Sequence, residues 1–258
     1  MLKELTEALS CSGLNVATVK RTLIDVRQFH GLVGKDAADV TSSDVAAYFS
    51  LLHEEGMAPT TIQRKAASLR KALVTLAPTN ALRIEWPTLP KVTHYSKSGT
   101  LTEQQVQDLC VVAEGMNPRD RAIVSLVLLS GAKTNAVAGI RLSDLKVDSV
   151  TLAISSNKTY EAPLAPRTKA DIDAWLAVRP PATHDFLFTS ERFPYPGISR
   201  AVVWAVWKQL EAASPHGLPK GATLAARNTL VNACGSCQEL VERLGYDRRT
   251  AEAILSAR

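Results

Sequence analysis

A segment rich in proline and polar residues divides the chain into two parts of different character. This segment, IEWPTLPKVTHYSKSG at 84–99, contains two prolines and a glycine and fits neither helical periodicity nor strand alternation. The part before it is rich in alanine and leucine and has the spacing of about four helices. The part after it has further helices and at least one strand-like run. A length of 258 residues suffices for two modest domains, so we expect domains at 1–84 and 100–258 joined by a linker at 85–99.

Composition and charge limit the classes of protein to which the chain can belong. Apolar residues make up 46% and charged residues 21%, which is typical of globular proteins and excludes disorder along the whole chain. No apolar run approaches the ~18 residues of a membrane span. The net charge of +5 permits a nucleic-acid partner without requiring one. The N-terminus has no secretory signal, so the cytoplasm is the expected compartment.

The cysteines and the absence of cofactor motifs point away from a metal or redox centre. Four cysteines are too few and too scattered for a disulfide framework. Cys234 and Cys237 form one C-x-x-C pair, but a structural zinc ion takes about four ligands and no second pair accompanies it. We expect this pair to pack between helices, with metal or redox chemistry as the alternative. No glycine-rich phosphate motif is present, and we expect neither a metal nor a cofactor.

The fourth helix of the first part combines an apolar stripe with a basic face. Pro59 suits its first turn, and Arg64, Ser68 and Lys71 are predicted to project away from the stripe. From 58 to 91, six Lys and Arg residues stand against Glu85 alone. Such a face can lie in the major groove of DNA, or it can be the solvated face of a helical bundle. The apolar stripe consists of Ile62, Ala66, Leu69 and Leu73.

Several segments of the second part carry clear secondary-structure signals. Thr102 and Gln105 have the spacing of a capping box for a helix that ends near residue 114. Asn117-Pro118 begins a second, apolar helix. VTLAIS at 150–155 alternates as a strand does, and TYEAPL is its expected return strand. Further helices are expected from 198 to 213 and from 223 onward, with breaks at Gly235 and Gly245. The fold class is therefore mainly α with a small β-sheet.

The order of these segments resembles that of the tyrosine recombinases, the family of phage integrases and Xer-like proteins. NVATVKRTLIDVRQF and APTTIQRKAASLRKAL resemble two helices of the family's core-binding domain, and RDRAIVSLVLLSGAKTNAVAGIRLSDL resembles the stretch around its first catalytic arginine. GATLAARNTL resembles the His-x-x-Arg box, and ERLGY resembles the Leu-Gly-His box. The resemblance implies a helical, SAM-like core-binding domain followed by an α+β catalytic-like domain. In that family a tyrosine hydroxyl attacks a DNA phosphodiester without an external cofactor.

The resemblance also implies which positions would carry this chemistry, and most hold a different residue. A lysine replaces the first arginine, a leucine and a tyrosine replace the two histidines, and a leucine replaces the nucleophile. Only the second arginine is retained, and the hairpin lysine is either Lys158 or replaced by Ser155. A leucine has no atom that can form a phosphate ester, so we expect the fold without strand cleavage. The family positions correspond to Lys133, Lys158, Leu224, Arg227, Tyr246 and Leu255.

We therefore predict a duplex-DNA-binding protein that serves as an accessory or regulatory factor in DNA recombination or mobile-element biology. It would clamp DNA between its two domains, associate with the nucleoid when bound, and meet an active recombinase or further copies of itself on DNA. Lys133, Lys158 and Arg227 could instead be surface charges or paired ions. One alternative is a divergent active enzyme that uses Tyr246, and another is a module that binds an active recombinase. The candidate DNA contacts are Arg21, Gln28, Thr61, Gln63, Arg64, Lys65, Ser68, Lys71, Lys133, Arg141, Lys158 and Arg227.

Overall fold

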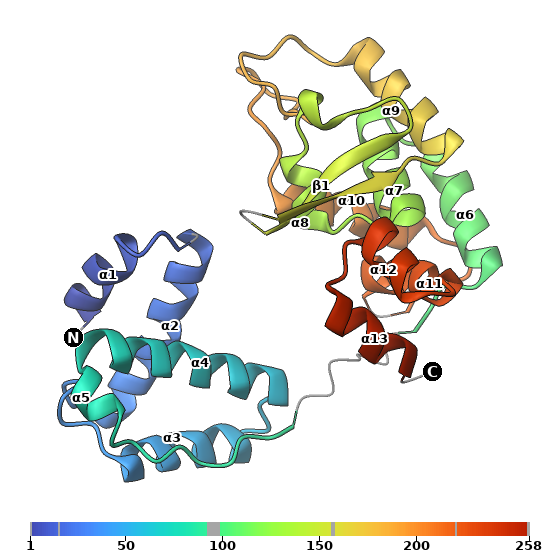
Figure 1. The fold of residues 1–258 in the computed structure, drawn as a ribbon. Helices are drawn as coiled ribbons and strands as arrows, with labels where there is room; N and C mark the ends of the chain where they lie inside the picture. The colour runs from blue at the N-terminus through green and yellow to red at the C-terminus, as the bar shows by residue number, and fades with distance from the viewer. Residues whose placement is uncertain (1, 15, 92–98, 156–157, 220, 257–258) are drawn as a thin grey trace. The chain divides into compact units, whose positions relative to one another are not determined.

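Two compact units, Met1–His94 and Tyr95–Arg258, make up the protein. The structure is a computed structural model and describes residues 2–14, 16–91, 99–155, 158–219 and 221–256 (Figure 1). Residues 92–98 of the predicted linker lie outside the described residues. The rest of the predicted linker, 85–91 and 99, is neither helix nor strand. The roles assigned to the two domains stay predictions.

The first unit is a bundle of helices built around α2 and α4. The apolar stripe predicted for the fourth helix is confirmed, because Ile62, Ala66, Leu69 and Leu73 are all buried. Helix α4 packs against α2, and α1 contacts both of them. The segment that resembles a helix of the family's core-binding domain forms α2, which begins at Val16. The helices are α1 (Leu2–Ser10), α2 (Val16–Val33), α3 (Ser42–Glu54), α4 (Pro59–Leu76) and α5 (Pro78–Ala81).

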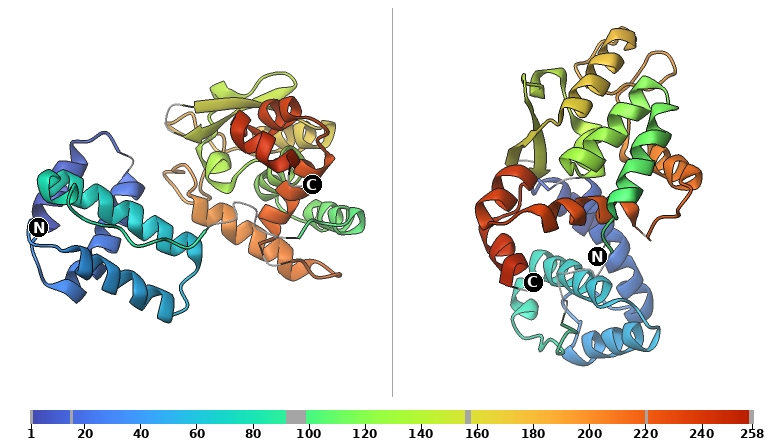
Figure 2. Two further views of the ribbon diagram at one scale, coloured as in Figure 1. Left: turned by 60° about the horizontal axis from the view of Figure 1, so that its bottom comes forward. Right: turned by 90° about the vertical axis from the view of Figure 1, so that its right-hand side faces the viewer.

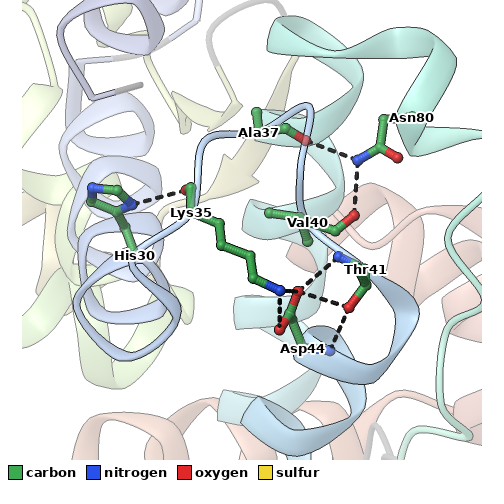
Figure 3. Close-up of polar contacts among 7 residues, drawn as sticks. All are labelled: His30, Lys35, Ala37, Val40, Thr41, Asp44 and Asn80. Carbon is green, nitrogen blue, oxygen red and sulfur yellow. Dashed lines mark hydrogen bonds and ion pairs between the residues drawn. The ribbon is translucent and has the colours of Figure 1, made fainter.

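The N-terminus of α3 is fixed by a capping box that also binds a lysine (Figure 3). The hydroxyl of Thr41 accepts from the amide of Asp44, and the Asp44 carboxylate accepts from the Thr41 amide at 2.8 Å. Lys35 donates to both oxygens of the same carboxylate. These hydrogen bonds, that of Lys35 first, lower the pKa of Asp44 from 3.8 to about 2. The start of α3 is therefore set by local sequence, as such caps usually are.

The loop between α2 and α3 is held from both sides (Figure 3). Asn80 of α5 donates through Nδ2 to the carbonyl oxygens of Ala37 and Val40, each at 2.9 Å. The ring nitrogen Nδ1 of His30 lies 3.2 Å from the carbonyl oxygen of Lys35. Because these backbone carbonyls would otherwise lack partners inside the fold, the short helix α5 fixes the path of a loop about forty residues earlier.

The second unit surrounds a buried helix, α7, with a small sheet at one edge. The capping box of Thr102 and Gln105 and the N-cap at Asn117 are confirmed. Helix α9 has no counterpart in the sequence-based expectations. The elements are α6 (Glu103–Glu114), α7 (Pro118–Ser130), α8 (Thr134–Gly139), η1 (Leu142–Asp144), β1 (Ser149–Ser155), β2 (Lys158–Pro163), α9 (Pro166–Val178), α10 (Arg200–Ala213), α11 (Ala222–Ala233), α12 (Cys237–Leu244) and α13 (Arg248–Ser256).

The two predicted strands form an antiparallel pair. Val150 faces Ala162 and Leu152 faces Tyr160, with an irregularity in the register between Ala153 and Ser155. The turn at 156–157 lies outside the described residues. Strand β2 contacts α12, so the sheet lies beside the C-terminal helices (Figures 1 and 2). The mainly helical fold with a small sheet is confirmed.

Helix α9 packs against α7 through a buried carboxylate. Oδ1 of Asp171 forms an ion pair with Arg121, whose Nε lies 2.8 Å away. Oδ2 of Asp171 accepts a hydrogen bond from the hydroxyl of Ser125. Trp175 donates its indole N–H to the carbonyl oxygen of Leu187 at 2.9 Å. The hydrogen bonds of Ser125 and Trp175 satisfy polar groups that burial would otherwise leave unpaired. Among the described residues, none of the helices has the length and apolar character needed to cross a bilayer.

Candidate nucleic-acid interface

A shallow groove with a basic lining lies between α2 and α4 in the first unit. Its volume is ≈ 610 Å³. Arg21 of α2 and Arg64 and Lys71 of α4 bring three positive charges to the lining, and Ala17 and Ala67 contribute small side chains. The structure thus brings a predicted cation of the second helix together with two of the fourth. The lining is completed by Thr18, Thr22 and Ser68.

Asp25 of α2 is a buried carboxylate that contacts two residues of this lining. Its side chain is 2% exposed. Oδ2 accepts from Nη1 of Arg64 and from Oγ of Ser68, the latter at 2.8 Å. Nζ of Lys65 lies 3.9 Å from Oδ1. The buried charge is therefore compensated by hydrogen bonds and by two cations, as a buried carboxylate requires.

Two residues of the predicted basic face are not in solvent. Lys65 and Ser68 are 5% and 7% exposed. Burial lowers the pKa of the Lys65 ammonium, although the nearby Asp25 carboxylate opposes this effect. Ser68 was predicted to project away from the apolar stripe, and this is wrong, because α2 covers that side of α4 and supplies the Asp25 carboxylate. Lys65 is covered in the same way, and its contact with DNA stays a prediction.

The other predicted contacts of the first unit have partners inside the fold or are partly covered. Gln28 accepts through Oε1 from the ammonium of Lys65. Gln63 donates through Nε2 to the carbonyl oxygen of Pro90 at 2.8 Å and so ties the segment after α5 to α4. Thr61, in the first turn of α4, is half-buried. The side-chain amides of Gln28 and Gln63 thus have structural roles. Their contact with DNA stays a prediction.

In the second unit Arg227 of α11 is a buried connector between backbone segments. It is 5% exposed. Its Nη1 donates to the carbonyl oxygen of Gly131, which ends α7, and its Nη2 donates to that of Leu244, which ends α12. Its Nε donates to the hydroxyl of Tyr246 at 3.3 Å, and its guanidinium carbon lies 4.8 Å from the centre of that ring. The donors of Arg227 are thus directed to protein acceptors, and its predicted contact with a DNA phosphate stays a prediction.

The space around Arg227 is filled by aromatic and aliphatic side chains. The Tyr160 ring lies directly over Gly245, so that an added Cβ at Gly245 would stand 2.4 Å from the ring. Burial raises the pKa of the Tyr160 hydroxyl, and the positive charge of Arg227 opposes this effect. Lys133 lines a small pocket together with Tyr160 and Gly245. Partial burial and then the charge of Arg227 lower the pKa of Lys133. The polar side chains near Arg227 are therefore those of Tyr160, Tyr246 and Lys133.

The remaining positions of the second unit are spread over its surface. Arg141 forms an ion pair with Asp185 and lies 5.0 Å from the centre of the Phe186 ring. Lys158 begins β2 and is exposed. Its charge contributes to the lowered pKa of Asp247, after the hydrogen bonds from Thr250. Arg141 is thus a paired ion, whereas Lys158 stays a predicted phosphate contact. Leu224 in α11 is 41% exposed.

Leu255 and the cysteine pair belong to the apolar cluster of the C-terminal helices. Leu255 in α13 and Tyr246 pack against this cluster, which includes buried Leu240 and Ile254. Cys234 is buried within it, and Cys237 is half-buried beside it. Both cysteines thus pack between helices as predicted. Within the described residues, no group of three or more His, Cys, Asp or Glu side chains could hold a metal ion.

Asp25, the carboxylate that pairs with Arg64, was not among the residues predicted from the sequence. It lies among Thr22, Val26 and Phe29, which are buried residues of α2. An acidic residue at a core-facing position of a helix predicts a buried ion pair, because such a residue almost always has a partner. Which partner it has depends on how α2 packs on α4.

Comparison with known proteins gives distant relatives and close structural neighbours. No known family profile matches the chain. A tyrosine recombinase XerD from Ralstonia nicotianae (strain GMI1000) is 25% identical over an alignment of 197 residues. The match covers 68% of this chain and 60% of the length of that relative. A lambda integrase (75–356) dimer bound to a COC' core site has a TM-score of 0.71 at 13% identity, with 98% of this chain and 93% of that chain covered. The XerH recombinase in a pre-cleavage complex with difH substrate has a TM-score of 0.69 at 12% identity, with 99% and 82% covered.

Proposed function

We propose that this chain, which has the fold of the tyrosine recombinases and integrases and resembles XerD in sequence, binds duplex DNA without cutting it. The observation that carries the proposal is the α2–α4 groove, whose lining includes the cations Arg21, Arg64 and Lys71 together with small alanine side chains. Clustered cations attract the phosphate backbone, and small residues in the lining let a nucleic-acid backbone or base edge approach closely. The lambda integrase and XerH neighbours are complexes with a COC' core site and a difH substrate, which favours the same interpretation.

The absence of cleavage is supported by the second unit. Strand cleavage by this family's chemistry needs a nucleophilic hydroxyl and donors that stabilise the charge developing on phosphorus. Leu255, to which the resemblance assigns the nucleophile position, packs against an apolar cluster. Leu224 has no polar atom, and the donors of Arg227 are directed to backbone carbonyls. A protein of this kind acts by occupying or shaping DNA, as an accessory or regulatory factor for recombination.

The proposal predicts how DNA affinity responds to salt when one groove cation is removed. For Lys71→Ala we expect the slope of log affinity against log salt concentration to fall by about 0.9, the value for one lost phosphate contact. The DNA is the duplex fraction that the protein enriches from fragmented genomic DNA of its source. The matched control is Arg70→Ala on the same helix, because Arg70 does not line the groove and lies 4.5 Å from the Trp86 ring centre. No change in Lys71→Ala would remove Lys71 from the interface, and an equal change in both variants would show that the contacts are not specific to the groove.

A second prediction concerns covalent chemistry. We expect no protein–DNA adduct when the protein is incubated with a nicked duplex that carries an enriched site and is then run on a denaturing gel. The hydroxyl of Tyr246 accepts a hydrogen bond from Nε of Arg227, so the alternative of a divergent active enzyme has a specific test. An adduct formed by the native protein and lost in Tyr246→Phe would establish that alternative. Tight binding to an active recombinase that persists at high salt, with no affinity for DNA, would instead favour an interaction module.

A further inference from the structure

The three cations of the α2–α4 groove differ in how they are held. Arg64 donates through Nη1 to the buried Asp25 carboxylate, which Ser68 and Lys65 hold in turn. Arg21 and Lys71 are exposed and have no ion-pair partner among the described residues. Two of the cations are thus exposed and without an ion-pair partner within the described residues, and one is paired with a buried carboxylate.

The way each cation is held matters because a contact with a phosphate and a contact with a base place different demands on the side chain. A phosphate can be bound by a guanidinium or by an ammonium, because a backbone contact needs positive charge and carries no sequence information. The N7 and O6 atoms of guanine are two acceptors in one plane, which a guanidinium meets best with its two-pronged edge held in a set orientation. Fixing the guanidinium before binding lowers the entropy lost on binding. The buried Asp25 neutralises part of the Arg64 charge, which weakens Arg64 as a phosphate ligand but orients it.

The surroundings of Arg64 leave room for a base edge. Its side chain is 38% exposed although one nitrogen is bound to Asp25. Ala67, three residues after Arg64 on the same helix, is exposed and also lines the groove. A methyl group there allows close approach, whereas a longer side chain would fill the space.

We propose that Arg64 recognises a guanine through the major groove and that Asp25 is the positioning residue that orients Arg64 for this contact. Arg21 and Lys71 hold the flanking phosphates. This inference rests on the proposed function, since it names the chemistry that the same groove recognises. It gives the protein a sequence preference at one base pair in addition to its general affinity for DNA.

The test is a set of duplexes in which each base pair of an enriched site is changed in turn. The native protein should show one position at which guanine is preferred by about tenfold. Arg64→Lys keeps the charge but lacks the planar fork, so it should lose this preference and keep the salt slope. Lys71→Ala should do the reverse, and Arg70→Ala should change neither.

Asp25→Asn separates positioning from charge. The substitution makes the groove more positive, so a purely electrostatic role predicts tighter binding and an unchanged preference. Positioning predicts that the guanine preference falls severalfold. In an Arg64→Lys background, Asp25→Asn should cause no further loss of preference. Circular dichroism verifies folding, and Arg64→Lys is sufficient to test the guanine contact if Asp25→Asn does not fold.

The outcomes of these measurements separate the inference from the proposed function. A guanine preference that survives Arg64→Lys overturns the inference, as does an Arg64→Lys variant that loses about one unit of salt slope with preference intact. In either case Lys71-dependent DNA binding would leave the proposed function standing. No binding of the native protein to any duplex would overturn both.

Discussion

Replacement of Arg227 by methionine is expected to lower the free energy of unfolding of the second unit by about 3–5 kcal/mol. Methionine keeps much of the length of the side chain but removes its N–H groups. The carbonyl oxygens of Gly131 and Leu244 then remain buried without their donor, and the ends of α7 and α12 are no longer joined. Urea unfolding followed by tryptophan fluorescence measures this, because Trp175, Trp204 and Trp207 all lie in the second unit.

The matched control for this prediction is Arg243→Met, an exposed arginine in the last turn of α12. An exposed charge of this kind contributes little to stability, and we expect a change within about 0.5 kcal/mol. If Arg227→Met unfolded like the native protein but lost its affinity for DNA, Arg227 would be a phosphate ligand. The connecting role drawn from its burial would then be incorrect.

Gly245→Ala should destabilise the second unit by about 2–5 kcal/mol, the sum of a conformational cost and an overpacking cost. Gly245 ends α12 with a φ of +64°, a conformation that costs about 1–2 kcal/mol for a residue with a Cβ. The added Cβ would also stand 2.4–2.7 Å from three carbons of the Tyr160 ring. Overpacking of this kind costs about 1–3 kcal/mol, because the ring is confined between the sheet and α12. The free energy comes from the same urea titration.

Gly217→Ala separates the two contributions. Gly217 has a φ of +61°, and nothing lies within 4 Å of an added Cβ there. We expect the conformational cost of about 1–2 kcal/mol alone. The difference between the two variants then reports the contact of Tyr160 with Gly245. Equal losses would show that the Tyr160 ring moves aside, and that the space around Arg227 is less fixed than the structure indicates.

Local sequence patterns were enough to predict where many helices and strands begin and what kind of fold they build. Capping at Thr102 and Asn117 and the alternation of β1 depend on neighbouring residues, so no knowledge of distant segments was needed. The order of motifs along the chain led to the same fold that the lambda integrase and XerH structures share with it. Helix α9 was not predicted, although Pro166 occupies its first position, where proline is common in helices.

Packing between distant segments sets what the polar residues do. Periodicity separates the two faces of α4, but it does not reveal that the Asp25 carboxylate of α2 covers Lys65 and Ser68. Motif matching retained Arg227 as a phosphate donor, but its partners come from Gly131 and Leu244, which are 96 and 17 residues away along the chain. A buried charge is stable only where acceptors from other segments surround it, and those acceptors are set by packing. The amino-acid sequence therefore defines the helices and strands and their order along the chain. Only the tertiary structure shows that Arg64 is paired, that Lys65 and Arg227 are buried, and that Arg21 and Lys71 are exposed.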